Sequence, residues 1–323
     1  LKVGHMFLAL AQQPTRDGTA SRVRQVCSIL AIRYLLAAFH NELTPSYVRI
    51  GALAQAYQVR SLQVNMVPSA AVPVDIDLSR ALHLYDGLDM GPLDEDYKVT
   101  IAAQHVRALT QARMWDSAER AAERLLDTLS PRKKLEGSRQ LRKARDDIRS
   151  RLAISLKEVN DGQLDRKPLL RRVEELAAPK IGLWERAVSE LRAAADTNAQ
   201  ARFALGDLLL RAGRTGEARR AYAELAPAPG EEWKLQLRRA LCDAIDGLDA
   251  EEQLRRIIED GNRPVAAYYL AVLLEEAGRY GEADEVISSV ASEDAQLDRL
   301  IRQVKSRLRE RFLRRAGALR SAT

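Results

Sequence analysis

Five carboxylates lie within eleven residues and form the densest group of possible metal ligands in the chain: Asp86, Asp89, Asp94, Glu95 and Asp96. A hard cation such as Ca²⁺ takes about six to eight oxygen ligands, but the spacing here does not match a calcium-binding loop. Leu93-Asp94 stands directly before an expected helix. Acidic side chains at a helix N-terminus cap its free N–H groups and are favoured by the helix dipole. We therefore expect helix capping here and no metal site.

The remaining residues offer little for catalysis. The chain has four histidines, and no two of them stand three or four residues apart: His5, His40, His83 and His105. It has no P-loop, no GxGxxG after a strand, no HExxH and no GxSxG. His105 occupies a position that we expect to be buried in a helix pair. The sequence thus predicts a protein that is not an enzyme, with no catalytic residues and no cofactor.

The composition predicts an all-α fold. Of the 323 residues, 46% are hydrophobic and 30% charged but only 5% aromatic, and the abundant Ala, Leu, Arg and Glu are strong helix formers. The bias towards Ala, Arg and Leu is typical of bacterial proteins. The two cysteines, Cys27 and Cys242, are too far apart and too few for a disulfide framework or a metal site. Both are expected to be buried, reduced thiols.

A cytoplasmic protein is the expectation from the apolar segments. The longest apolar run, Val26 to Phe39, is interrupted by Arg33 and is shorter than the about 20 residues of a membrane span. No signal peptide is visible. Because the first residue is Leu1 and not Met, a trimmed N-terminus leaves export or membrane anchoring open.

Helical periodicity, prolines and glycines divide the chain into five regions. In the first, alternation at Leu62, Val64 and Met66 followed by Pro68 and Pro73 indicates an extended connector in preference to a short strand. The expected regions are a helical N-terminal region over 1–92 with its connector near 60–77, a helix pair over 93–131, a basic helical connector over 132–182, repeated helix pairs over 183–292, and a basic amphipathic helix over 293–323.

Internal repetition is the strongest signal. One segment reads Leu205-Gly206, Gly213, Ala218 and Tyr222, and 65 residues later the chain reads Leu270-Ala271, Gly278, Ala283 and Ile287 with the same internal spacings. A small residue in the first helix permits close approach of the second. The glycine supplies the left-handed turn between them. The alanine sits where the two backbones nearly touch, and the large residue packs between pairs.

These segments resemble the tetratricopeptide repeat family over about 199–291 and, with His105, Trp115, Ala118 and Ala122, over 99–130. The family's first-helix tryptophan is Arg202 in one pair and Ala267 in the other, and Trp233–Asp260 fits only loosely. The resemblance implies an α-solenoid of stacked antiparallel helix pairs with a basic C-terminal capping helix; related helical-hairpin solenoids stay open.

The same resemblance implies a non-catalytic scaffold or adaptor that binds a protein or peptide partner along the concave face of the first helices. The residues at these positions are Phe203, Asp207, Leu210 and Arg211 in one pair and Tyr268, Val272, Glu275 and Glu276 in the other. Packing between repeats is an equally good interpretation of Phe203 and Tyr268. The Lys and Asn residues with which relatives clamp chaperone C-termini are absent, so that partner class is not expected.

Basic segments suggest the alternatives. Arg132–Arg151 holds nine Lys and Arg against three acids, and 297–323 holds nine against two, so the C-terminal segment carries +7 while the rest of the chain sums to −1. Capping of the solenoid is the first interpretation of that helix; nucleic acid, an anionic membrane, an acidic partner or a homo-oligomer contact are the others. The chain could also be the accessory repeat part of a larger enzyme or secretion assembly. Surface residues for such contacts are Arg299, Arg302, Lys305, Arg309, Arg314 and Arg315.

Overall fold

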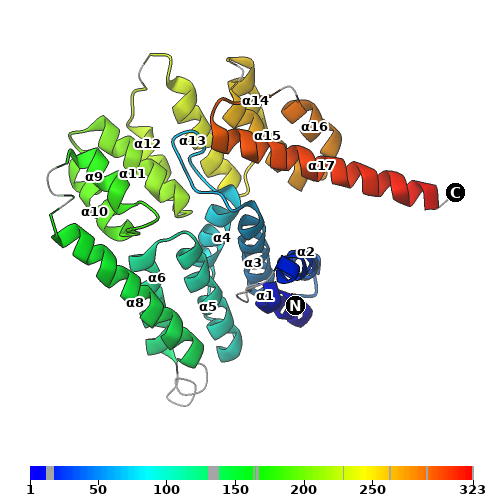
Figure 1. Ribbon diagram of the computed structural model, residues 1–323, viewed down its shortest axis with the longest axis horizontal. Coiled ribbons are helices and arrows are strands. Elements are labelled where there is room, and N and C mark those ends of the chain that lie inside the picture. The colour runs from blue at the N-terminus through cyan, green and yellow to red at the C-terminus, as the bar shows by residue number, and fades with distance from the viewer. Residues whose placement is uncertain are drawn as a thin grey trace. The chain divides into compact units, whose positions relative to one another are not determined.

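A computed structural model of the chain describes residues 1–11, 18–129, 138–162, 164, 167–227, 229–261, 263–288 and 290–321. Sixteen helices and no strand lie in these residues (Figure 1), so the predicted all-α fold is confirmed. The chain forms two compact units: Leu1–Asn65 with Ile76–Leu225, and Met66–Asp75 with Ala226–Thr323. The boundary after Leu225 lies inside the region 183–292.

Unit 1 begins with three helices, α1 (Lys2–Ala11), α2 (Gly18–His40) and α3 (Ser46–Val64). Leu8, Leu35 and Val59 meet in their shared core and are at most 1% exposed. Small residues allow this packing: a Cβ on Gly4 would lie 3.2 Å from the Leu35 side chain. α2 carries Cys27, which is buried and reduced as predicted, like Cys242 in unit 2.

The connector begins later than the sequence suggested. α3 continues through Leu62 and Val64, and it ends at Asn65, which has the left-handed φ of 48° and donates its N–H to the Ser61 carbonyl oxygen. The predicted start near residue 60 is therefore wrong: the alternation of Leu62 and Val64 is part of a helix end. The non-helical segment is Met66–Asp75.

Four helices follow in unit 1: α4 (Ile76–Gly87), α5 (Glu95–Gln111), α6 (Trp115–Thr128) and α8 (Ser138–Asn160). Asp94 is the N-cap of α5, as predicted, and its Oδ1 accepts the Tyr97 N–H at 2.8 Å. The predicted long basic helix is α8, which lies beside α6 (Figure 1); the part of that prediction before Ser138 falls outside the described residues.

The rest of unit 1 consists of α9 (Leu169–Leu176), α10 (Trp184–Ala195), α11 (Ala199–Arg211) and α12 (Thr215–Ala223). A half-buried carboxylate joins α10 to α6: Asp116 accepts the backbone N–H groups of Trp184 at 3.0 Å and Glu185 at 2.7 Å. It thus caps the N-terminus of a helix 68 residues away. Burial raises the pKa of Asp116, although hydrogen bonds from the backbone of Glu185, Ser117 and Arg186 act in the opposite direction.

Unit 2 contains Met66–Asp75 and five helices: α13 (Glu232–Ile245), α14 (Glu251–Glu259), α15 (Pro264–Glu276), α16 (Tyr280–Ser288) and α17 (Ala295–Ser321). The loosely fitting Trp233–Asp260 segment thus forms a helix pair of its own, α13 with α14.

One turn geometry closes four of the helix pairs. Gly213, Gly247 and Gly278 have φ of 74°, 76° and 76°, and Arg113 takes the same place with φ 60°. In each case the next residue's N–H bonds to the carbonyl five residues earlier, as Arg214 does to Leu209 at 2.9 Å. This is the Schellman arrangement, which satisfies free carbonyls at a helix end. The predicted left-handed role of Gly213 and Gly278 is therefore confirmed, and the turn before Trp115 is made without glycine.

The other repeat positions pack as their spacing indicated. Ala218, Tyr222, Ala283 and Ile287 are all 0% exposed. A Cβ on Gly206 would lie 2.3 Å from the Tyr222 ring. α11 and α12 can therefore approach this closely only because residue 206 has no side chain.

Candidate functional site

In unit 2, α15 binds a non-helical loop of the chain itself, Met66–Asp75, which lies between α3 and α4 (Figure 1). The Tyr269 hydroxyl donates to the Val74 carbonyl oxygen at 2.7 Å and accepts the Val74 N–H at 3.2 Å. One side chain therefore satisfies both backbone groups of one residue. Burial raises the pKa of Tyr269 well above its ordinary value, so the hydroxyl keeps the proton that it donates.

The other end of the segment is bound from α17. The Gln296 side-chain amide donates to the Val67 carbonyl oxygen at 2.5 Å. Between these two anchors, Ser69 closes a turn by accepting the Val72 N–H on Oγ at 3.1 Å. Val72 and Val74 are 0% exposed. Main-chain hydrogen bonds combined with buried alternate side chains are the usual means by which proteins bind extended peptides.

α17 covers the neighbouring surface of α15 and α16. Its apolar stripe is at most 4% exposed and consists of Leu297, Leu300, Ile301, Val304 and Leu308. Arg307 forms a bidentate pair with Glu275, with Nε–Oε1 at 3.2 Å and Nη2–Oε2 at 2.8 Å. Lys305 donates to the carbonyl oxygens of Ser288, the last residue of α16, and of Val290, which follows that helix. Up to Leu308, α17 is thus a packed terminal helix.

The predicted peptide-facing residues of α15 are mostly buried or paired within the chain. Tyr268 and Val272 are 5% and 6% exposed, Glu275 is paired with Arg307, and only Glu276 is exposed. The expectation of an open face at these positions is therefore corrected: the chain fills this face with its own residues.

The corresponding residues of α11 serve packing within unit 1. Leu210 is 0% exposed. The Phe203 ring packs edge-on against Tyr222 at 5.9 Å between centroids, and Asp207 accepts a hydrogen bond from the Tyr222 hydroxyl at 2.7 Å. The Arg211 carbonyl oxygen accepts from Ser79 at 3.0 Å. Phe203, Asp207 and Arg211 nevertheless remain partly exposed.

Several of the predicted basic surface residues are also engaged. Arg302 pairs with Asp298 at 2.8 Å, and Lys305 binds the carbonyls named above. Arg299 and Arg309 are exposed, whereas the side chains of Arg314 and Arg315 lie outside the described part of the chain. In α8, Arg149 binds Glu119 and Glu123 of α6, and Arg151 lies 4.8 Å from the Trp115 ring centroid.

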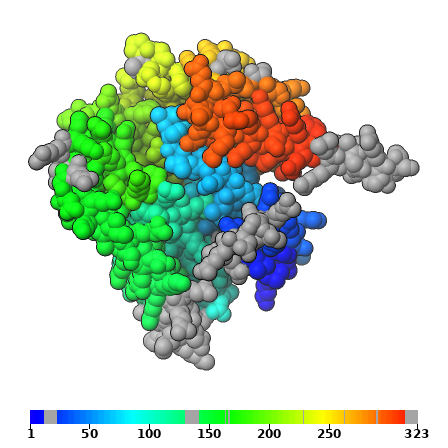
Figure 2. Space-filling model, viewed as in Figure 1, coloured from blue at the N-terminus to red at the C-terminus, as the bar shows by residue number. Residues whose placement is uncertain are grey.

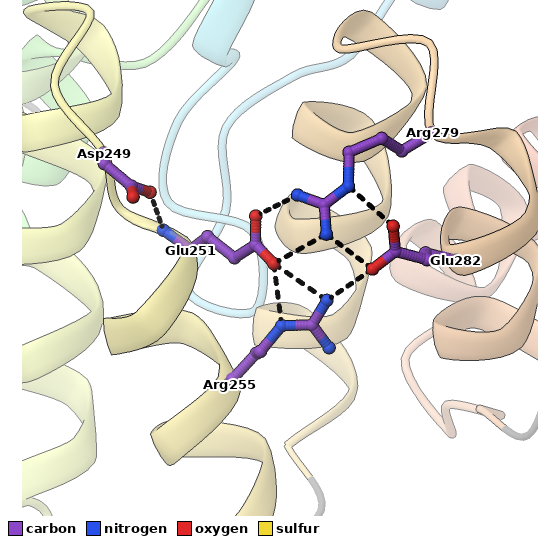
Figure 3. Close-up of polar contacts among 5 residues, drawn as sticks. All are labelled: Asp249, Glu251, Arg255, Arg279 and Glu282. Atoms are coloured by element: carbon purple, nitrogen blue, oxygen red, sulfur yellow. Dashed lines mark hydrogen bonds and ion pairs between the residues drawn. The ribbon is translucent and has the colours of Figure 1, made fainter.

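An ion-pair network joins the N-terminal ends of α14 and α16 (Figure 3). Arg279 contacts Glu251 and Glu282, and Arg255 contacts the same two carboxylates. Hydrogen bonding to Arg279 lowers the pKa of both glutamates. The arrangement recurs 65 residues earlier, where Glu217 binds Arg214 and Arg192. These ion pairs hold successive helix pairs together. The charges of the arginines and glutamates in them are already paired with one another.

A polar cluster around His105 contributes to the packing of unit 1. Its ring stacks on Tyr85 at 5.4 Å between centroids, and its Nε2 lies 3.3 Å from Asp86 Oδ1. Burial lowers the pKa of His105. Among the described residues, no three His, Cys, Asp or Glu side chains gather closely enough to hold a metal ion.

Comparisons with known proteins add no identity. Neither the protein-family models nor the curated proteins give a match to this chain. In the described residues, one helical stretch, Val23–His40, is long and apolar enough to cross a membrane by length and composition alone.

The sequence did not predict that residues 66–75 bind to α15. The available signals were Val-Pro-Val at 72–74 and the adjacent tyrosines 268 and 269. Neither signal indicates that these two segments contact each other, since Tyr269 and Val74 are 195 residues apart.

Proposed function

We propose that this protein is a non-catalytic helical scaffold, of the tetratricopeptide or a related helical-hairpin type, that holds a protein partner through an extended segment. The single observation that carries the proposal is the binding of Met66–Asp75 by α15 and α17. A face that binds the main chain of its own loop has the groups needed to bind the main chain of another protein.

The binding groups favour an extended apolar segment as the ligand. Tyr269 reads a main-chain N–H and C=O, which every residue except proline offers. Small apolar side chains such as Val72 and Val74 then fill the buried space. A partner segment of this kind takes the place of Met66–Asp75, so the chain's own segment acts as a competitor.

The recurring turns and ion pairs support the repeat part of the proposal. Four helix pairs close with the same backbone geometry. Arginine–glutamate pairs join successive helix pairs at Glu217 and again at Glu282, 65 residues later. Binding of nucleic acid or an anionic membrane by the basic segments is the weaker proposal, because Arg149, Arg302 and Lys305 already have partners within the chain.

The test is to replace the segment that α15 binds and to measure whether a peptide of the same sequence then binds in its place. In one variant, ten Gly and Ser residues replace Met66–Asp75, and a fluorescent peptide with the sequence MVPSAAVPVD is titrated in by anisotropy. We expect saturable binding to this variant and none to the intact chain. Tyr269→Phe in the emptied variant removes two hydrogen bonds and should weaken binding roughly tenfold.

A peptide with Asp in place of both valines at positions 72 and 74 is the matched control and should not bind. A circular-dichroism spectrum with native helix content shows that the emptied variant is folded. If the folded variant fails to bind the peptide, the proposal is wrong.

A further inference from the structure

Apolar side chains exposed to solvent are concentrated at the N-terminus of unit 1. Of the fifteen large hydrophobic residues exposed among those described, nine lie within the first 43 residues. Six of them define the N-terminal apolar face: Val3, Met6 and Leu10 of α1 and Val23, Val26 and Tyr34 of α2, each 41–59% exposed. Contiguous exposed apolar surface of this kind marks a binding surface more often than chance scatter does.

The two helices present these residues as one surface. Val3, Phe7 and Leu10 lie on one stripe of α1, and Val23, Val26 and Tyr34 lie on one stripe of α2, because each set follows helical spacing. The rings of Phe7 and Tyr34 stack in parallel with centroids 5.9 Å apart, which joins the two stripes. The opposite sides of both helices are packed in the core through Leu8, Ala31 and Leu35. Figure 2 shows these blue N-terminal helices at the surface of unit 1.

The charge around this face is positive. Residues 1–41 contain five Lys and Arg and a single acid, Asp17. Lys2 and Arg33 are exposed on α1 and α2 themselves. A second copy of the chain would bring the same positive charges together, whereas a surface of anionic lipid headgroups attracts them.

From this combination we infer that the N-terminal apolar face binds an anionic membrane surface, with α1 and α2 lying in the plane of the interface. An apolar face flanked by basic residues and nearly free of acids is the pattern of interfacial helices. Although Val23–His40 is apolar enough for a span, its Cys27, Ala31 and Leu35 are buried in the protein, so α2 lies on the bilayer and does not cross it. The inference is independent of the peptide-binding proposal.

The test is sedimentation of the full chain with vesicles of phosphatidylcholine alone or with about one-third phosphatidylglycerol. We expect binding to the anionic vesicles and weak binding to the neutral ones. Met6→Glu/Val26→Glu places two acids on the face and should lower the partition coefficient at least tenfold. Arg33→Gln should lower it about fivefold on anionic vesicles and leave binding to neutral vesicles unchanged.

Ile154→Glu/Leu156→Glu on α8 is the matched control, since it makes the same charge change at apolar side chains that are 61% and 42% exposed. Binding by this control equal to that of the wild type supports the inference. Three results would overturn it: no sedimentation of the wild type with anionic vesicles, an equal loss in the control, or a dimer in light scattering that Met6→Glu/Val26→Glu dissociates. The last would make a second copy the occupant.

Discussion

The contact between Gly213 and α4 provides a sharp test of the packing in unit 1. Gly213 has φ of 74°, and a Cβ there would lie 2.4 Å from the Ser79 carbonyl oxygen and 2.6 Å from the His83 backbone nitrogen. Both atoms belong to the main chain of α4, which cannot rotate out of the way as a side chain can. Gly213→Ala must therefore displace α4 from the end of α11.

Displacement breaks two hydrogen bonds, from Ser79 Oγ to the Arg211 carbonyl and between His83 Nδ1 and the Gly213 carbonyl, both 3.0 Å long. Each contributes about 0.5–1.5 kcal/mol. The left-handed backbone costs an alanine about 1–2 kcal/mol, and overpacking adds about 1–3 kcal/mol. Together we expect Gly213→Ala to lower the free energy of unfolding by about 3–8 kcal/mol.

Gly162→Ala is the matched control in the same unit. Gly162 also has φ of 74°, but a Cβ there has nothing within 4 Å. Only the backbone cost of about 1–2 kcal/mol then applies. The difference between the two variants therefore reports the close approach of α4.

Urea unfolding followed by far-UV circular dichroism measures the effect. The expected difference of about 2–6 kcal/mol corresponds to midpoints about 1–2 M urea apart. Amide hydrogen exchange should become faster in α4 and the end of α11 in Gly213→Ala alone. If the two variants have equal midpoints and equal exchange, the packing of α4 on α11 does not stabilise unit 1 in the way argued.

Three further predictions concern buried and surface charges. Asp116→Ala leaves the N–H groups of Trp184 and Glu185 without their acceptor and should destabilise unit 1 by about 2–4 kcal/mol, with faster amide exchange at these two residues. Asp116→Asn keeps an acceptor and should cost about half as much. Unchanged exchange in the alanine variant would contradict the capping role. Because burial lowers the pKa of His105 below its ordinary 6.5, the unfolded chain binds the proton more tightly than the folded one, so stability should fall as the pH drops from about 6.5 through the folded-state pKa. His105→Gln should flatten this part of a Tm-against-pH curve, and an unaltered slope would refute the assignment. Arg279→Gln should lower Tm slightly at low salt and not at about 1 M NaCl, where the screening length is about 3 Å; a large, salt-independent loss would show that the network is more than a surface one.

Much of the fold could be predicted because helices are set by local interactions. The composition and spacing predicted an all-α chain, the left-handed turns at Gly213 and Gly278, and the Asp94 cap, and the structure bears these out. Each of these features depends on residues within about one or two turns of one another. The helical spacing of the apolar residues from Leu297 to Leu308 likewise predicted that this stripe is buried.

The candidate site could be predicted only in part. The resemblance drew attention to α15, yet it indicated an open face at Tyr268 and Val272, both of which are buried. Periodicity shows which side of a helix is apolar and does not say what covers that side. The end of α3 was likewise misjudged, because Leu62 and Val64 alternate as in a strand, whereas α3 continues through both residues and leaves Leu62 exposed.

The sequence by itself determined the helices, their turns and the apolar stripes, since each follows from the conformational preferences of neighbouring residues. Only the tertiary structure decided that Tyr269 holds Val74, that Asp116 caps α10, and that the stripes of α1 and α2 stay exposed. These are contacts, or missing contacts, between segments far apart in the chain. Their physical basis is the competition among many apolar surfaces for burial, and that competition is resolved only when the whole chain has folded.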